Sequence, residues 1–212
     1  MPPRLIYIAD PMCSWCWGFA PVMTRVADRF AATLPIRLVL GGLRPGTTKP
    51  LDDDGRQTIR DHWRHVHEAS GQPFDFGFFD RAGFVYDTEP PSRAMVAVRG
   101  RRPDLALTYL ERVHRAFYAE GRDVTDRAVL VDLAAGHGLD RATFESDYDD
   151  EATLAVTRND FAIARQAGIT GFPTLLAGDD AQGYGIVTHG WQPWDAIEPR
   201  LVAAEPGPAP AT

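Results

Sequence analysis

Hydrophobic residues along the chain form short apolar runs separated by amphipathic segments, a pattern typical of an α/β fold. Apolar runs at 5–9 and 36–40 each end in a turn signal, Asp10-Pro11 and Gly41-Gly42, and predict two buried strands. A single helical face is marked between them by Phe19, Met23, Val26, Ala27 and Phe30. We therefore expect a helix over 13–32, kinked at Pro21, and a parallel, right-handed strand–helix–strand unit.

The pattern from 44 to 149 is helical, apart from a loop rich in Gly and Phe at 71–84. We expect helices at 54–70, 92–99 and 105–119, a helix capped by Thr125 that ends at Gly136 or Gly138, and a short one from Asp140 to Phe144. This block contains no strand pattern. It predicts an all-helical insertion.

The last part of the chain returns to mixed structure. A long helix is expected at 150–167, followed by strands at 174–177 and 184–189 that pair as an antiparallel hairpin, and by a helix opened by Pro193. The predicted organisation is a discontinuous α/β domain of residues 1–43 and 150–204, a helical insertion domain of residues 44–149, and a flexible Pro/Ala-rich tail at 205–212.

Composition and charge exclude several classes of partner. The 212 residues are 44% apolar and carry a net charge of −7 with a pI near 5.3, which argues against nucleic acid and against anionic membranes. No apolar stretch approaches the roughly 18 residues of a membrane span. The apolar run after Arg4 is too short for a signal peptide, so a cytoplasmic location is expected.

The only two cysteines, Cys13 and Cys16, stand three positions apart at the start of the first predicted helix. In the cytoplasm a lone disulfide is more often catalytic or redox-sensing than structural. The amino end of a helix stabilises an anion through its free N–H groups and its dipole. We therefore expect Cys13 to be the exposed nucleophile and Cys16, one turn on, to be the sheltered resolving thiol.

Two readings compete with this one. A structural zinc site would need two further ligands, and the only cluster on offer is His62, His65 and His67, of which His67 points away from the other two on a helix. We therefore expect no metal. The second alternative is a pair of inert cysteines.

The segment Asp10-Pro11-Met12-Cys13-Ser14-Trp15-Cys16-Trp17-Gly18-Phe19 resembles the DsbA-type branch of the thioredoxin-like superfamily. The resemblance is strongest to the cytoplasmic DsbA-family group described as predicted protein-disulfide isomerases, with FrnE-type proteins as relatives. Gly171-Phe172-Pro173-Thr174 is similar to the loop whose proline is cis in this superfamily. Pro21, the helical block and the segment 116–126 also match the family pattern.

The resemblance implies a thioredoxin-like mixed sheet with an all-helical, DsbA-like insertion. It also implies a thiol–disulfide oxidoreductase or protein disulfide isomerase that acts by dithiol–disulfide exchange on protein or peptide thiols and disulfides. Such a protein requires no cofactor, although glutathione or a thioredoxin-type reductant would recycle the pair. The dipeptide Ser14-Trp15 differs from the Pro-His of DsbA and the Gly-Pro of thioredoxin, so the direction of exchange stays open.

The site residues implied by the resemblance are Cys13, Cys16 and Pro173 as catalytic residues, and Trp15, Phe172 and Thr174 as substrate-binding residues. Asp10 is a candidate proton acceptor for Cys16, and capping of the following turn explains it equally well. Arg93 and His114 are possible groove residues, but residues of these types are more often surface charges or satisfied, partly buried groups.

Two other functions remain open. Glutathione-dependent transferases and isomerases of the kappa and hydroxychromene-carboxylate type share the insertion topology, but they usually carry serine at the first cysteine position and lack the pair. A chaperone-like binding module would use the disulfide only as a redox switch, and aromatic residues around the site would suit it.

Overall fold

The computed structural model describes residues 2–206. Most of the predicted tail at 205–212 therefore lies outside the described residues. Four strands build one mixed sheet in the order β2-β1-β3-β4. Their bounds are β1 Arg4–Ala9, β2 Ile36–Leu40, β3 Thr174–Asp179 and β4 Gly183–His189. β1 runs parallel to β2 and antiparallel to β3, and β3 and β4 form an antiparallel hairpin, as predicted.

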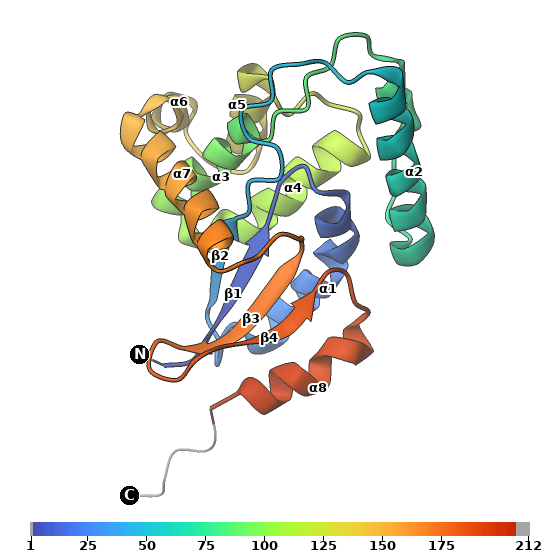
Figure 1. Ribbon diagram of the computed structural model, residues 1–212. Coiled ribbons are helices and arrows are strands. Elements are labelled where there is room, and N and C mark those ends of the chain that lie inside the picture. The colour runs from blue at the N-terminus through green and yellow to red at the C-terminus, as the bar shows by residue number, and fades with distance from the viewer. Residues whose placement is uncertain (1, 207–212) are drawn as a thin grey trace, which may run out of the picture.

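Eight α-helices accompany this sheet in the described part of the chain. Their bounds are α1 Ser14–Phe30, α2 Asp53–Ser70, α3 Glu89–Arg101, α4 Ala106–Tyr118, α5 Arg127–Gly136, α6 Arg141–Asp149, α7 Glu151–Gln166 and α8 Trp194–Ala204, with 3₁₀ turns at Phe76–Asp80 and Pro103–Leu105. In Figure 1 the helices α2 to α6 gather at one end of the sheet, beyond the ends of β1 and β2. The fold class predicted from sequence is confirmed. The division into domains at 43 and 150 stays a prediction.

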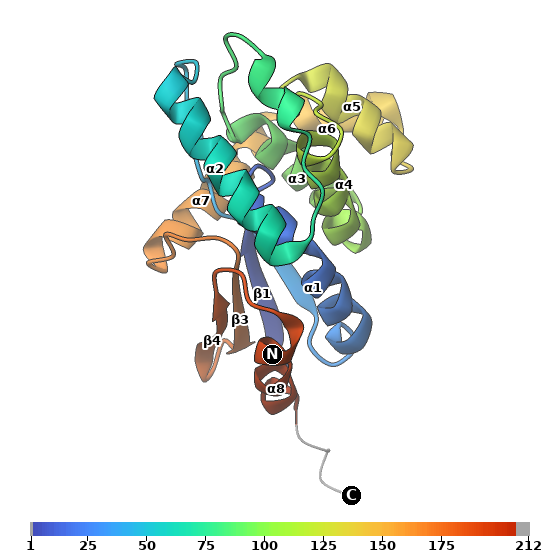
Figure 2. The same ribbon diagram turned by 90° about the vertical axis from the view of Figure 1, so that its right-hand side faces the viewer.

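Strand β1 shows why the sheet has helices on both faces. Leu5, Tyr7 and Ala9 belong to the main core beneath α1, whereas Ile8 packs with Val39 and with Ala164 of α7. Successive side chains of a strand point to opposite faces, so a strand buried on both faces reads as a continuous apolar run. Figure 2 shows α7 on one side of the sheet and α1 on the other.

Some predicted helix ends are wrong. The helix predicted at 13–32 covers Ser14–Phe30, with Cys13 as its N-cap. Asp126, rather than Thr125, caps α5, because the Asp126 side chain accepts a hydrogen bond from the Ala128 N–H. The Thr125 hydroxyl is instead bonded to Asp123.

Two further predicted helices are too short. The one predicted at 92–99 begins at Glu89, since the two prolines that follow fit a first helical turn. Asp140 does cap α6, but this helix runs on to Asp149 rather than ending at Phe144. No helix of the described residues is long and apolar enough to cross a membrane.

Candidate functional site

The cysteine pair lies where the chain leaves the sheet and enters α1. The carbonyl of Cys13 accepts the Cys16 and Trp17 N–H groups at 3.0 and 3.1 Å, which starts the helix directly after this residue. Both cysteines are free thiols. Cys16 is fully buried, and burial raises the pKa of its thiol well above the ordinary value. Cys13 is the more accessible thiol, but it is only 7% exposed, so the expectation of an exposed nucleophile is wrong in degree.

The loop before β3 faces Cys13. The Phe172–Pro173 peptide bond is cis, as the family resemblance predicted. The thiol of Cys13 donates to the Phe172 carbonyl oxygen at 3.5 Å. Thr174 is fully buried, and its hydroxyl donates to the Gly171 carbonyl at 2.8 Å, so this side chain braces the loop from within.

Asp10 directly follows β1, three residues before Cys13, and is fully buried. Its carboxylate accepts the Met12 N–H at 2.9 Å and the Leu43 N–H at 2.8 Å. Burial raises the pKa of Asp10 to about 6 despite these two bonds. The carboxylate thus fastens the turn ahead of Cys13 to the segment after β2, which is a capping role. Its raised pKa is also compatible with proton transfer.

Trp15 is half-buried and covers the site from the side of β4. Its ring lies 6.3 Å from that of Trp191, whose indole N–H donates to the Gly18 carbonyl at 3.1 Å. Trp15 lines the same cavity as Cys13.

A cavity of about 250 Å³ opens next to Cys13. One wall is the cis-proline loop, and the other comes from the helical block, through Ile59, His62, Trp63 and Tyr86. The Tyr86 hydroxyl donates to the Met12 carbonyl at 2.6 Å, which ties this wall to the cysteine turn. Sequence reasoning missed these wall residues, because periodicity shows that a helix has a buried face but not which surface that face meets.

The three histidines do not converge. His67 bonds the Gln72 carbonyl through Nδ1 at 2.8 Å, while His62 lines the cavity beside Cys13. No group of three potential metal ligands occurs within residues 2–206.

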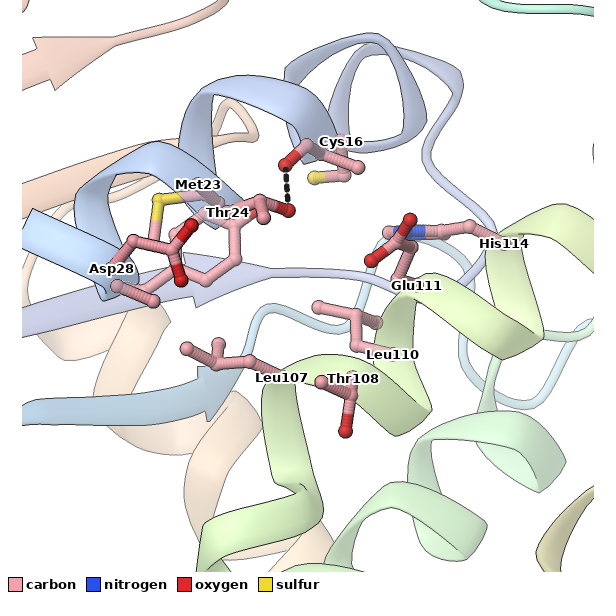
Figure 3. A pocket seen from close by; sticks show the side chains of 12 residues that line it. Cys16, Met23, Thr24, Asp28, Leu107, Thr108, Leu110, Glu111 and His114 are labelled. Carbon is pink, nitrogen blue, oxygen red and sulfur yellow. Dashed lines mark hydrogen bonds between the residues drawn. The ribbon is translucent and has the colours of Figure 1, made fainter. Parts of the chain in front are cut away.

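A second cavity, of about 110 Å³, lies behind Cys16 between α1 and α4 (Figure 3). Cys16 and His114 share its wall, and Glu111 and Asp28 also line it. His114, a possible groove residue by sequence, is a core residue on the inner side of the cysteines, with 1% of its surface exposed. Arg93 forms a bidentate ion pair with Glu89 away from the cysteines.

The DSBA-like thioredoxin domain model matches residues 5–202. The chain belongs to this family. Its structural neighbours include thiol–disulfide oxidoreductases, which supports an enzyme of the thiol–disulfide type. A structure described as a "putative protein disulfide isomerase" from Nitrosomonas europaea is 35% identical, with a TM-score of 0.89, and covers 96% of this chain and 97% of its own.

Two further similar proteins carry names that state a function. The cytosolic disulfide reductase DsbM from Pseudomonas aeruginosa is 28% identical, with a TM-score of 0.78 over 95% of this chain and 100% of its own, and a second DsbM structure is with GSH. The ClpXP adapter protein SpxH of Halalkalibacterium halodurans is 22% identical over 91% of this chain. The chain spans 64% of the length of that relative.

Proposed function

We propose that this DSBA-like protein catalyses dithiol–disulfide exchange with protein or peptide substrates through Cys13 and Cys16. One observation carries the proposal: Cys13 is the N-cap residue of α1, and its thiol donates to the Phe172 carbonyl of the cis-proline loop. A sulfur anion at this position faces the first N–H groups of the helix. The buried Cys16 lies one turn away, within reach of any sulfur bonded to Cys13.

In the reductive direction, the Cys13 thiolate attacks one sulfur of a substrate disulfide. The substrate S–S bond breaks, its second sulfur leaves as a thiolate and takes up a proton, and a mixed disulfide with Cys13 remains. Cys16 then loses its proton and attacks the Cys13 sulfur. The second substrate thiol is released, the Cys13–Cys16 disulfide forms, and two electrons have passed to the substrate. The reverse sequence oxidises a substrate dithiol.

The neighbouring residues take distinct parts in this scheme. Pro173 holds the loop so that the Phe172 backbone can bond an extended substrate segment in the manner of an added strand. Trp15 contacts apolar side chains of that segment. Thr174 supports this loop from its buried side, through the hydrogen bond from its hydroxyl to the Gly171 carbonyl. Asp10, with its pKa raised to about 6 by burial, serves as the proton acceptor when Cys16 ionises.

The environment of the reaction is also part of the proposal. A reductive role in the cytoplasm, with glutathione or a thioredoxin-type protein regenerating the dithiol, agrees with the similarity to the cytosolic reductase DsbM and with its structure with GSH. No metal or organic cofactor takes part in the scheme.

The similarity to SpxH favours a second candidate, a binding module whose cysteine pair is only a redox switch. A glutathione-dependent transferase or isomerase is disfavoured, because the second thiol, Cys16, is present and shielded in the position of a resolving cysteine. These candidates differ in which thiols they need. Exchange requires both, glutathione conjugation does not require Cys16, and simple binding requires neither.

The deciding experiment compares wild type, Cys13→Ser and Cys16→Ser in the reduction of insulin by dithiothreitol. We expect Cys13→Ser to be inactive. Reduced Cys16→Ser, freed of dithiothreitol and then mixed with oxidised insulin, should accumulate a mixed disulfide that mass spectrometry detects on Cys13. Full insulin reduction by Cys13→Ser would overturn the proposal. Full activity of Cys16→Ser would support the glutathione-dependent alternative.

A further inference from the structure

The cavity beside Cys13 continues into a longer groove along α7. A third cavity, of about 500 Å³, shares Leu43, Thr170 and Phe172 with the cavity beside Cys13. Its apolar floor includes the rings of Phe161 and Phe172, which lie against the glycine turn after β2. A substrate segment whose cysteine meets Cys13 would therefore extend past Phe172 into this groove.

The charges along this groove are unlike those of the rest of the protein. Its cationic side chains are Arg44 next to Cys13 and Arg158 and Arg165 on α7. Among residues 2–206 no carboxylate lines either cavity, although the sequence contains 29 Asp and Glu residues and has a net charge of −7. Isolated exposed arginines are ordinary. Three in one carboxylate-free groove of an acidic protein call for an anionic partner.

These arginines are also available for binding. Within residues 2–206, Arg158 and Arg165 are exposed and have neither an ion pair nor a side-chain hydrogen bond, whereas thirteen other arginines take part in ion pairs. Arg44 lies over the Tyr86 ring at 5.4 Å and is held at the wall of the site by this contact.

We propose that the groove binds an acidic segment of a protein substrate, with carboxylates on one side of the reactive cysteine. The inference rests on the proposed function and adds substrate specificity to it. Arg158 and Arg165 both line the part of the groove that lacks Cys13, so the acidic residues come from one side of the substrate cysteine. The two arginines are seven residues apart on α7, which corresponds to about 10 Å. An extended peptide covers that span in roughly three residues.

The test uses peptides with a single cysteine that is joined to 2-nitro-5-thiobenzoate as a mixed disulfide. Each peptide carries either two Glu or two Gln, three residues apart, before the cysteine in one series and after it in another. The measured quantity is the rate of nitrothiobenzoate release by the reduced protein, divided by the rate with dithiothreitol to remove the intrinsic reactivity of each peptide. Cys13→Ser gives the background rate.

We expect wild type to prefer the Glu peptide of one series by roughly three- to tenfold at low salt, since each exposed ion pair contributes modestly. The preference should shrink at high salt. It should fall to near one in Arg158→Gln/Arg165→Gln and persist in Arg37→Gln, the matched control. Arg37 is exposed on β2, lines neither cavity and has no ion pair within residues 2–206.

Other results would separate the possible failures. Equal rates for Glu and Gln peptides in wild type, or an unchanged preference in the double variant, would overturn the groove proposal and leave dithiol exchange standing. No release above background with any peptide would instead count against the proposed function. If the double variant slowed only glutathione disulfide reduction, the groove would serve a small thiol, and the assignment to acidic protein segments would be wrong.

Discussion

The Nε2 atom of His114 lies 3.0 Å from the backbone carbonyl oxygen of Asp10, beneath the cysteine turn. Because a carbonyl oxygen only accepts, the proton of this hydrogen bond belongs to Nε2. In the neutral ring Nδ1 is therefore unprotonated and carries a lone pair. That Nδ1 is buried and has no partner within the described residues. The bond ties α4 to the end of β1. The bond therefore links two residues with buried titratable side chains, the imidazole of His114 and the carboxyl of Asp10. Their effects on stability should have opposite dependences on pH.

Asp10→Asn should change how stability varies with pH. Burial raises the pKa of Asp10 from 3.8 to about 6, so the folded state binds this proton more tightly than the unfolded chain does. The stability that the proton contributes is fully present below about pH 4 and is lost as the pH rises through 6. Between pH 4 and pH 7, wild type should therefore lose about 3 kcal/mol relative to Asp10→Asn in urea unfolding.

The lost acceptor in Asp10→Asn leaves a backbone N–H of Met12 or Leu43 poorly paired. That cost is independent of pH. The difference between the two unfolding curves across pH is therefore the decisive quantity, and curves that stay parallel from pH 4 to pH 7 would contradict the prediction.

His114→Gln should produce the opposite slope. Burial lowers the pKa of His114 from 6.5 to about 4, so the unfolded chain takes up this proton first as the pH falls. Stability from the neutral ring is fully present above pH 6.5 and is lost as the pH falls toward 4. Wild type should lose about 3 kcal/mol relative to His114→Gln between pH 7 and pH 4.

Glutamine at position 114 offers an N–H donor for the Asp10 carbonyl, which keeps the hydrogen bond without the titrating ring. The two substitutions together give a sharp comparison, because the contributions of Asp10 and His114 partly cancel in wild type. Urea unfolding of both variants and of the wild type at several pH values measures this. A His114→Gln variant with the same slope as the wild type would refute the assignment of a buried neutral histidine.

The ion pair between Arg99 and Asp160 should be worth more than the surface pairs. Asp160 is almost fully buried, and its Oδ2 accepts Arg99 Nη1 at 2.6 Å and the Leu40 N–H at 3.0 Å, which fastens α7 to β2 and α3. Asp160→Ala removes the carboxylate from the Arg99 guanidinium, which keeps the Leu38 carbonyl, and leaves the Leu40 N–H without its acceptor. It should cost about 3 kcal/mol in the free energy of unfolding.

Asp104→Ala is the matched control, since the Arg102–Asp104 pair is exposed on both sides and should cost little. The double variant Arg99→Met/Asp160→Leu should recover part of the loss, because it leaves no buried charge without a partner. Equal losses for Asp160→Ala and Asp104→Ala in urea unfolding would rule out a special role for the buried pair.

Local pattern was sufficient for much of the fold. The apolar run of β1 is buried on both faces, the Gly- and Asp-rich segment between β3 and β4 is a turn, and Asp140 caps a helix, because each depends on residues close in sequence. The cysteine pair could also be recognised from local sequence, because its two residues are three positions apart. The cis bond before Pro173 followed only from the family resemblance, since a trans bond is the default for any proline.

The contacts that complete the site could not be predicted in this way. Tyr86 reaches the Met12 carbonyl from 74 residues away, and His114 reaches the Asp10 carbonyl from 104 residues away. Periodicity identified α4 as a helix with one apolar face, but it does not say which surface that face meets. The same limit applied to the groove along α7, whose arginines lie about 120 residues from the turn after β2 in sequence and line one cavity with it.

Gly41→Ala should disturb the site through the Phe172 ring. A Cβ at position 41 would lie 2.2 Å from a carbon of that ring, so the ring must move. Phe172 also supplies the carbonyl that accepts the Cys13 thiol, and a shifted ring changes the position of this loop against the sulfur. We expect a loss of roughly 1–3 kcal/mol in stability from overpacking and a several-fold slower release of nitrothiobenzoate from a peptide disulfide.

Gly100→Ala is the matched control, because its Cβ meets nothing within 4 Å inside α3 and alanine favours a helix. It should keep the exchange rate and unfold no more easily than wild type. If Gly41→Ala exchanged disulfides as fast as Gly100→Ala, the packing of Phe172 would not control the position of the loop against Cys13.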